Sequence, residues 1–144
     1  FYSTRLSIAL RKQSGLVYSV DSALEAGRTR SAYLVEYACD PPNVVKAAAM
    51  VRREIADMQR TPVGRDELLR VKELLVRQIP LEESSVDAIA GGMISRIDLG
   101  LPLDEPTIAA RRYIELGPAQ IEAAFRKWMR PDDLVRVSEG PAPH

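Results

Sequence analysis

The sequence predicts an α+β fold in which a mainly antiparallel sheet carries helices packed on one face. Two strand-like runs, Leu16–Leu24 and Ser31–Cys39, are separated by a turn at Gly27, a spacing typical of an antiparallel hairpin. About five helical segments follow, and one further strand, Leu134–Val137, closes the chain. Because three strands make a thin sheet, we expect that strands preceding Phe1 are missing from this chain. Residues 1–144 are therefore predicted to be a single domain without its first strands.

The segment before the hairpin predicts a short helix. Ser3 or Thr4 can cap its start, and the helix is expected to reach about Gln13. Gly15 can end it, because glycine adopts the left-handed backbone conformation at low cost.

The second strand-like run alternates, so that one face of it carries Tyr33, Val35 and Tyr37. Asp40–Asn43 then breaks the strand, and its prolines suit the first turn of a helix. That helix has apolar residues at steps of three and four, which predicts one face packed on the core and an end near Thr61. The residues of this face are Val44, Ala48, Val51, Ile55 and Met58.

Four more helices are predicted beyond Thr61. The first begins near Arg65, and its inward positions are expected to be Leu68, Val71, Leu75 and Ile79. Pro80 should kink or break this helix, because proline has no N–H to donate. The others are expected at Glu82–Asp98, Pro106–Glu115 and Pro118–Met129.

Composition excludes several classes of protein. The hydrophobic fraction of 46% and the charged fraction of 28% are those of a soluble globular protein, which argues against disorder. The formal net charge is zero, so the basic surface that binds nucleic acid is not expected. No apolar run approaches the length of a membrane span. Cys39 is the only cysteine, which excludes an internal disulfide.

Most catalytic chemistry is also missing. The only histidine is His144, the last residue, so neither a Ser-His-Asp triad nor a His-x-x-Glu-His zinc motif can be built. Cys39 fits a small buried residue better than a nucleophile. The chain should therefore not turn over a substrate alone, and any catalytic contribution would be electrostatic and made to another domain.

The first segment carries a resemblance. Phe1–Ala23, FYSTRLSIALRKQSGLVYSVDSA, is similar to the pattern Ser-Arg-Leu, Leu-Arg, Gly-Leu-x-Tyr-Ser-Val of the pitrilysin/insulinase superfamily of zinc peptidases, which includes mitochondrial processing peptidase. The matching domain is the C-terminal, metal-free half. Three later segments resemble the family in outline, although their helical patterns are shared by many proteins. They are the strand exit and helix Cys39–Met58, the helix Thr61–Gln78 and the closing strand within Asp132–Pro141.

The resemblance implies a role for two residues. Family members are built from related α+β halves that close around a chamber, and one half carries zinc on His-x-x-Glu-His. The other half lends an arginine and a tyrosine, and the matching positions here are Arg11 and Tyr18. They are expected to bind the substrate carbonyl and the developing oxyanion of a peptide substrate. No cofactor is expected in this chain, since zinc belongs to the partner half, in the same polypeptide or in a separate subunit. Family habit favours the bacterial periplasm or cell envelope over the cytoplasm.

Other interpretations stay open at this point. A non-catalytic assembly or partner-binding subunit of the same superfamily could keep both residues, and an unrelated α+β binding module is a third alternative. Arg11 also suits a helix C-terminus, where its charge offsets the helix dipole, and Tyr18 also suits a core strand. The spacing of an arginine and a tyrosine is a weak motif by itself.

Overall fold

The computed structural model describes residues 4–141, apart from the side chain of Glu82. Ser3, one of the two predicted helix caps, and His144 lie outside the described residues. The chain divides into two compact units. The first runs to Glu25 and includes Ala32–Thr61 and the chain from Glu122, and the second comprises Ala26–Ser31 and Pro62–Ile121. The assignment of residues 1–144 to a single domain stays a prediction.

The first unit opens with a short, wide helix. The π-helix η1 covers Ser7–Gln13. The hydroxyl of Thr4 accepts a hydrogen bond from the backbone N–H of Ser7 at 3.1 Å and so caps the start of the helix, as the sequence predicted. The helix ends at Gln13, and Gly15, two residues further on, has a φ of 62° in the left-handed region. Leu10 is fully buried, with 0% of its surface exposed, and it centres the core of this unit.

The predicted antiparallel hairpin is confirmed. Strand β1 (Ser19–Glu25) pairs with β2 (Ala32–Ala38) in a register that sets Ser22 opposite Val35. Strand β1 begins three residues later than the predicted start at Leu16. The reason is that the N–H of Leu16 donates to the carbonyl of Leu10 at 2.9 Å and so still closes the helix.

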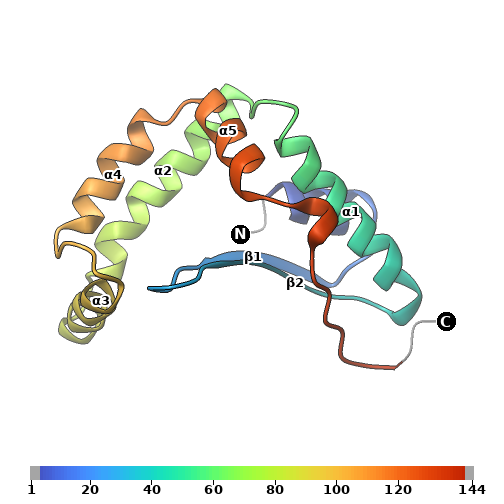
Figure 1. Ribbon diagram of the computed structural model, residues 1–144, viewed down its shortest axis with the longest axis horizontal. Helices are drawn as coiled ribbons and strands as arrows, with labels where there is room; N and C mark the ends of the chain where they lie inside the picture. The colour runs from blue at the N-terminus through green and yellow to red at the C-terminus, as the bar shows by residue number, and fades with distance from the viewer. Residues whose placement is uncertain (1–3, 142–144) are drawn as a thin grey trace. The chain divides into compact units, whose positions relative to one another are not determined.

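The core of the first unit lies between the hairpin and two helices. The 3-10 turn η2 (Pro41–Asn43) leads into α1 (Val44–Met58), and Figure 1 shows α1 and η1 on the same side of the hairpin. The half-buried face of the hairpin, with Tyr33, Val35 and Tyr37 as predicted, packs on a cluster from both helices and the bend. That cluster consists of Leu6, Ala9, Leu10, Val17, Ala47, Val51 and Ile55. The buried position in the first turn of α1 is Ala47, whereas the predicted Ala48 is half-buried.

A polar clasp joins α1 to the end of α5 (Pro118–Trp128). The side-chain amide of Gln59 donates to the carbonyls of Phe125 and Met129, both at 3.0 Å. In return, Arg126 Nε donates to the carbonyl of Gln59 at 2.6 Å. The carbonyl of Phe125 also accepts the backbone N–H of Met129 at 3.0 Å, and the carbonyls of Gln59 and Met129 lie just beyond the helix ends, where intrahelical donors run out.

The predicted closing strand, Leu134–Val137, is wrong. The short turn η3 (Pro131–Asp133) is followed by chain without regular structure, and Val135 and Val137 are 91% and 90% exposed. The alternation of side chains suits a strand, but a strand also needs a partner with which to exchange hydrogen bonds. In the part of the chain that the structure describes, the sheet therefore has two strands.

The second unit is helical. It contains α2 (Arg65–Glu82), α3 (Val86–Leu99) and α4 (Glu105–Glu115). Helices α2 and α4 lie side by side (Figure 1), and Lys72 Nζ donates to the carbonyl of Ile114 at 2.7 Å. Pro80 does not interrupt α2, which continues for two residues beyond it, so the predicted helix start at Glu82 is wrong. Helix α3 begins instead after Ser85, whose hydroxyl caps the N–H of Ala88 at 3.1 Å.

The second unit buries little apolar surface. Val63 is its one buried hydrophobic residue among those that the structure describes. Of the predicted inward positions of α2, Leu68, Leu75 and Ile79 are half-buried, but Val71 is 46% exposed. Helix α3 leaves Val86, Ile94 and Ile97 more than half exposed, at 81%, 62% and 64%. None of the helices within residues 4–141 is both long and apolar enough to cross a membrane.

Substituting Leu10 tests the central contact of the first unit. Leu10→Ala should lower the free energy of unfolding by about 2–5 kcal/mol, because a fully buried leucine is replaced by a cavity. Denaturant unfolding followed by circular dichroism measures this change. Ile8→Ala on the same helix is the matched control, since Ile8 is 37% exposed, and it should cost clearly less. Equal losses for the two variants would show that Leu10 does not centre the core.

Candidate functional site

The bend between η1 and β1 is built by two adjacent residues, Ser14 and Gly15. The hydroxyl of Ser14 donates to the carbonyls of Ala9 and Leu10, at 2.7 and 2.9 Å, and so closes the last turn of η1. Gly15 follows with positive φ, and a Cβ there would meet nothing within 4 Å, so the requirement for glycine comes from the backbone and not from space. The chain then reverses into β1. Arg11 precedes this bend and Tyr18 follows it.

Tyr18 is held at the surface by two hydrogen bonds. Its backbone N–H donates to the carbonyl of Ala38 at 2.8 Å, which extends the β1–β2 pairing by one residue. Its hydroxyl donates to Asp40 Oδ1 at 2.7 Å. The side chain remains 64% exposed, which is incompatible with the alternative role of Tyr18 as a core residue. The result is an oriented phenol whose ring faces solvent.

Asp40 also changes the acidity of that phenol. The hydrogen bond to Asp40, reinforced by the negative charge of the carboxylate, raises the pKa of Tyr18 above its ordinary value. Tyr18 therefore stays a neutral O–H donor throughout the neutral pH range. The adjacent Cys39 is half-buried, and burial, followed by the charge of Asp40, raises the pKa of its thiol, which keeps the sulfur in its unreactive form.

Arg11 lies in the last turn of η1 with its side chain exposed. A cation in this position offsets the negative end of the helix dipole, so Arg11 has a structural role whether or not it contacts a ligand. Both residues that the sequence singled out thus belong to the first compact unit, flank the same bend and expose their side chains. Their function as substrate contacts stays a prediction.

Sequence reasoning missed Asp40 as the partner of Tyr18. The signal was present in the predicted hairpin, because continuing the register past Ser19 and Ala38 brings Tyr18 opposite Cys39 and next to Asp40. From the sequence, Asp40 is predicted only to belong to the segment that ends the strand and begins the helix. The π-helical winding of η1 was missed as well, and such wide turns occur frequently at functional sites.

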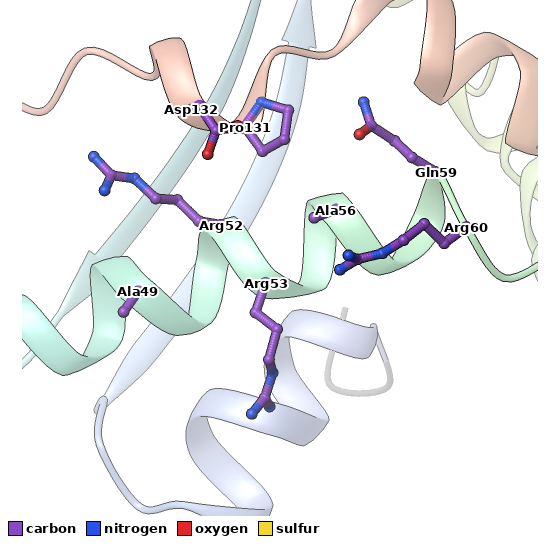
Figure 2. Close-up of a pocket in the computed structure, with 8 residues that line it drawn as sticks. All are labelled: Ala49, Arg52, Arg53, Ala56, Gln59, Arg60, Pro131 and Asp132. Atoms are coloured by element: carbon purple, nitrogen blue, oxygen red, sulfur yellow. The ribbon is translucent and has the colours of Figure 1, made fainter.

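A groove of about 470 Å³ runs along α1 but does not include Arg11 or Tyr18. Figure 2 shows its lining residues, which are Ala49, Arg52, Arg53, Ala56, Gln59, Arg60, Pro131 and Asp132. Two of its arginines already have carboxylate partners, Arg53 with Glu54 at 3.2 Å and Arg60 with Asp57 at 3.0 Å. The side chains of Arg52 and Arg53 also point in different directions (Figure 2). The groove therefore lacks a convergent set of charges for a ligand.

The described residues do not fit a metal ion. Within residues 4–141, no three side chains of histidine, cysteine, aspartate or glutamate come together in an arrangement that could hold one.

The acidity of Tyr18 can be tested directly. Asp40→Asn should lower the pKa of Tyr18 toward 10.0, because the negative acceptor is replaced by a neutral one. Ultraviolet titration of tyrosinate, with Tyr18→Phe subtracted to isolate this residue, measures the shift. Since the folded-state pKa is raised, the stabilising effect of the hydrogen bond is present below pH 10 and lost as the pH rises through that pKa. An unchanged titration in Asp40→Asn would mean that the hydrogen bond does not form in solution.

Two solved structures share this fold. The peptidase M16 inactive domain from Pseudomonas fluorescens superposes with a TM-score of 0.78 at 22% identity, over 92% of this chain and 31% of that one. The periplasmic protease PqqL from Escherichia coli superposes with a TM-score of 0.68 at 15% identity, over 85% of this chain and 14% of that one. The chain thus spans about a third or less of the length of these proteins. No protein of curated function matches the sequence.

The family follows from the sequence match. The family model described as "Peptidase M16 inactive domain" matches residues 2–75, just over half of the 144 residues. This match covers η1, the hairpin, α1 and the first part of α2, and so includes both Arg11 and Tyr18. The resemblance to the pitrilysin/insulinase superfamily is confirmed, and an unrelated α+β module is excluded. The chain belongs to the peptidase M16 inactive-domain family.

Proposed function

We propose that this chain is the metal-free half of a zinc-dependent peptidase and that Arg11 and Tyr18 are its contribution to the cleavage site. The observation that supports this most is the state of Tyr18, a phenol that is 64% exposed and yet held in one orientation by Asp40. Preorganised donors of this kind stabilise negative charge that develops in a transition state.

Arg11 supplies a permanent positive charge beside the same bend. Its guanidinium is planar and carries several N–H donors, so it can hold the carbonyl of a peptide in a fixed orientation. The helix to which it belongs is anchored by the buried Leu10, one residue earlier in the chain. An arginine on an anchored helix loses less freedom when it binds than one on a loop, and this favours a positioning role.

Tyr18 must change its partner in order to act. A phenol has a single O–H donor, and in the structure that donor is used by Asp40. Binding to the carbonyl oxygen of a substrate therefore requires the hydroxyl to leave Asp40. We infer that Asp40 holds Tyr18 in a resting orientation until a stronger acceptor arrives. The raised pKa of Tyr18 ensures that the proton is still available at that moment.

The bond-breaking chemistry would belong to a partner half with a His-x-x-Glu-His motif, either in the same polypeptide or in a second subunit. The residues described here do not form a metal site, so no metal-dependent step is assigned to this chain. An extended, unfolded peptide is the proposed substrate. The cell envelope is the proposed location, and the structural neighbour PqqL is a periplasmic protease.

Cleavage assays with the assembled protein test this proposal. Arg11→Ala and Tyr18→Phe should each lower kcat/KM for an unstructured peptide at least about tenfold, as expected when one transition-state donor is lost. Cleavage is measured with a fluorogenic peptide, using this chain together with its zinc-bearing half. Circular dichroism should show that both variants are folded, because both side chains are exposed.

Two neighbouring substitutions serve as controls. Lys12→Ala removes an exposed cation next to Arg11, and Tyr113→Phe removes a tyrosine hydroxyl from the second unit. Neither should change cleavage. If all four variants cleave at the wild-type rate, Arg11 and Tyr18 take no part in the reaction. An assembly that cleaves no peptide at all would instead favour the non-catalytic, partner-binding subunit.

A further inference from the structure

The second compact unit contains a pocket that the proposed function does not use. It has a volume of about 380 Å³, within the range of small-ligand sites, and it lies among the end of α2, helix α3 and the start of α4. Its lining is mostly apolar and consists of Ile79, Glu83, Ala88, Ile89, Gly92, Arg96 and Pro106. Only two of these side chains, those of Glu83 and Arg96, carry charge.

Arg96 brings an unsatisfied donor to this pocket. Its Nε is buried and has no hydrogen-bond partner among the residues that the structure describes. The ion pairs of this part of the chain do not include one between Arg96 and Glu83. Burying a guanidinium donor without an acceptor is costly, so such groups normally have a partner. Within the described residues Arg96 therefore has a donor without an acceptor, and water or a ligand that enters the pocket can supply one.

Gly92 provides the space in which Arg96 lies. A Cβ at position 92 would come within 3.2 Å of Arg96 Nη1 and 3.6 Å of Nη2, so the guanidinium rests on the bare backbone one turn earlier in α3. The adjacent Gly91 is different, because a Cβ there would meet nothing within 4 Å. Glycine weakens a helix, and at position 92 this weakness is compensated by room for the arginine.

We propose that this pocket binds a carboxylate attached to an apolar body, with Arg96 as its anchor. A guanidinium matches a carboxylate through two parallel hydrogen bonds, and Nε is one of the donors in that arrangement. Ile79, Ile89 and Pro106 supply apolar walls for the rest of the ligand. The C-terminal residue of a peptide with an apolar side chain has this chemistry, as does a glutamate side chain flanked by apolar residues.

The charge of the pocket favours a carboxylate over a phosphate. A single arginine supplies one positive charge, and Glu83 lines the same pocket with an opposing one. A phosphate carries up to two negative charges and usually gathers several donors, which the lining residues do not offer. The negative charge of Glu83 should also weaken the binding of any anion, so removing that charge should tighten the binding of a carboxylate.

Peptide titrations followed by NMR of the isotope-labelled chain test the site. The probes are acetyl-Ala-Leu with a free carboxylate, the same peptide as its C-terminal amide, and acetyl-Leu-Glu-Leu-amide. The free-acid peptide should shift the amide signals of Ala88 and Gly92 and bind at least tenfold more tightly than its amide. If acetyl-Leu-Glu-Leu-amide binds more tightly than the free-acid dipeptide, the source of the carboxylate is an internal glutamate; if the dipeptide binds more tightly, the source is a chain end.

Matched variants assign the binding to Arg96. Arg96→Gln should weaken binding at least tenfold, while Arg111→Gln, an exposed arginine of α4, removes the same charge and should leave binding unchanged. Gly92→Ala should weaken binding because its methyl group displaces the guanidinium, whereas Gly91→Ala should not. Both alanine variants favour the helix, so loss of folding cannot explain a difference between them. Glu83→Gln should tighten binding.

Several results would overturn the proposal. They are equal binding of the acid and the amide, equal binding by wild type and Arg96→Gln, or absence of binding by all three peptides. Equal peptide affinities of Gly91→Ala and Gly92→Ala would show that the guanidinium of Arg96 does not need the space above Gly92 in order to bind. None of these measurements depends on peptide cleavage, so the site can fail or hold independently of the roles of Arg11 and Tyr18.

Discussion

The packing of η1 between the hairpin and α1 is the contact on which the first unit depends. Leu10 is completely enclosed there, and the neighbouring cluster from Leu6 to Ile55 surrounds it. This contact fixes the position of the helix end, and the helix end fixes the Gly15 bend. The two candidate site residues are then displayed on opposite sides of a rigid corner. The positions of Arg11 and Tyr18 thus depend on apolar packing a few residues away.

A single hydrogen bond, from the hydroxyl of Tyr18 to Asp40, holds the phenol in the orientation seen in the structure. Asp40 orients the phenol of Tyr18 and at the same time competes for the only proton that the phenol can donate. The bond that orients the phenol therefore also keeps its proton from a substrate. The balance is favourable only if the incoming acceptor carries more negative charge than an ordinary carbonyl, which is the condition that arises as a peptide bond is attacked. In the proposed function, this competition would favour the transition state over the ground state.

The sequence predicted those features that depend on local pattern. The alternation around Tyr33 identified the hairpin, and the spacing of Val51 and Ile55 identified the buried face of α1. Resemblance identified the family and the two candidate residues. The closing strand near Leu134 could not be excluded from sequence, because a strand exists only where another strand offers hydrogen bonds.

Features that depend on tertiary contacts remained out of reach. The wide winding of η1 is one such feature, because helical periodicity alone does not distinguish a π-helix from an ordinary helix. Gly91 and Gly92 look identical in the sequence, yet in the fold one faces open space and the other supports a guanidinium. The two glycines differ because the side chain of Arg96 folds back over Gly92 and not over Gly91.

The single cysteine of the chain has a practical consequence. In the sequence, Cys39 lies between Ala38 and Asp40. The carbonyl of Ala38 accepts the backbone N–H of Tyr18, and Asp40 accepts the hydroxyl of Tyr18. Because the thiol is half-buried and kept protonated, thiol reagents should modify it slowly. Its alkylation rate therefore reports on the accessibility of the end of β2 without any engineered label.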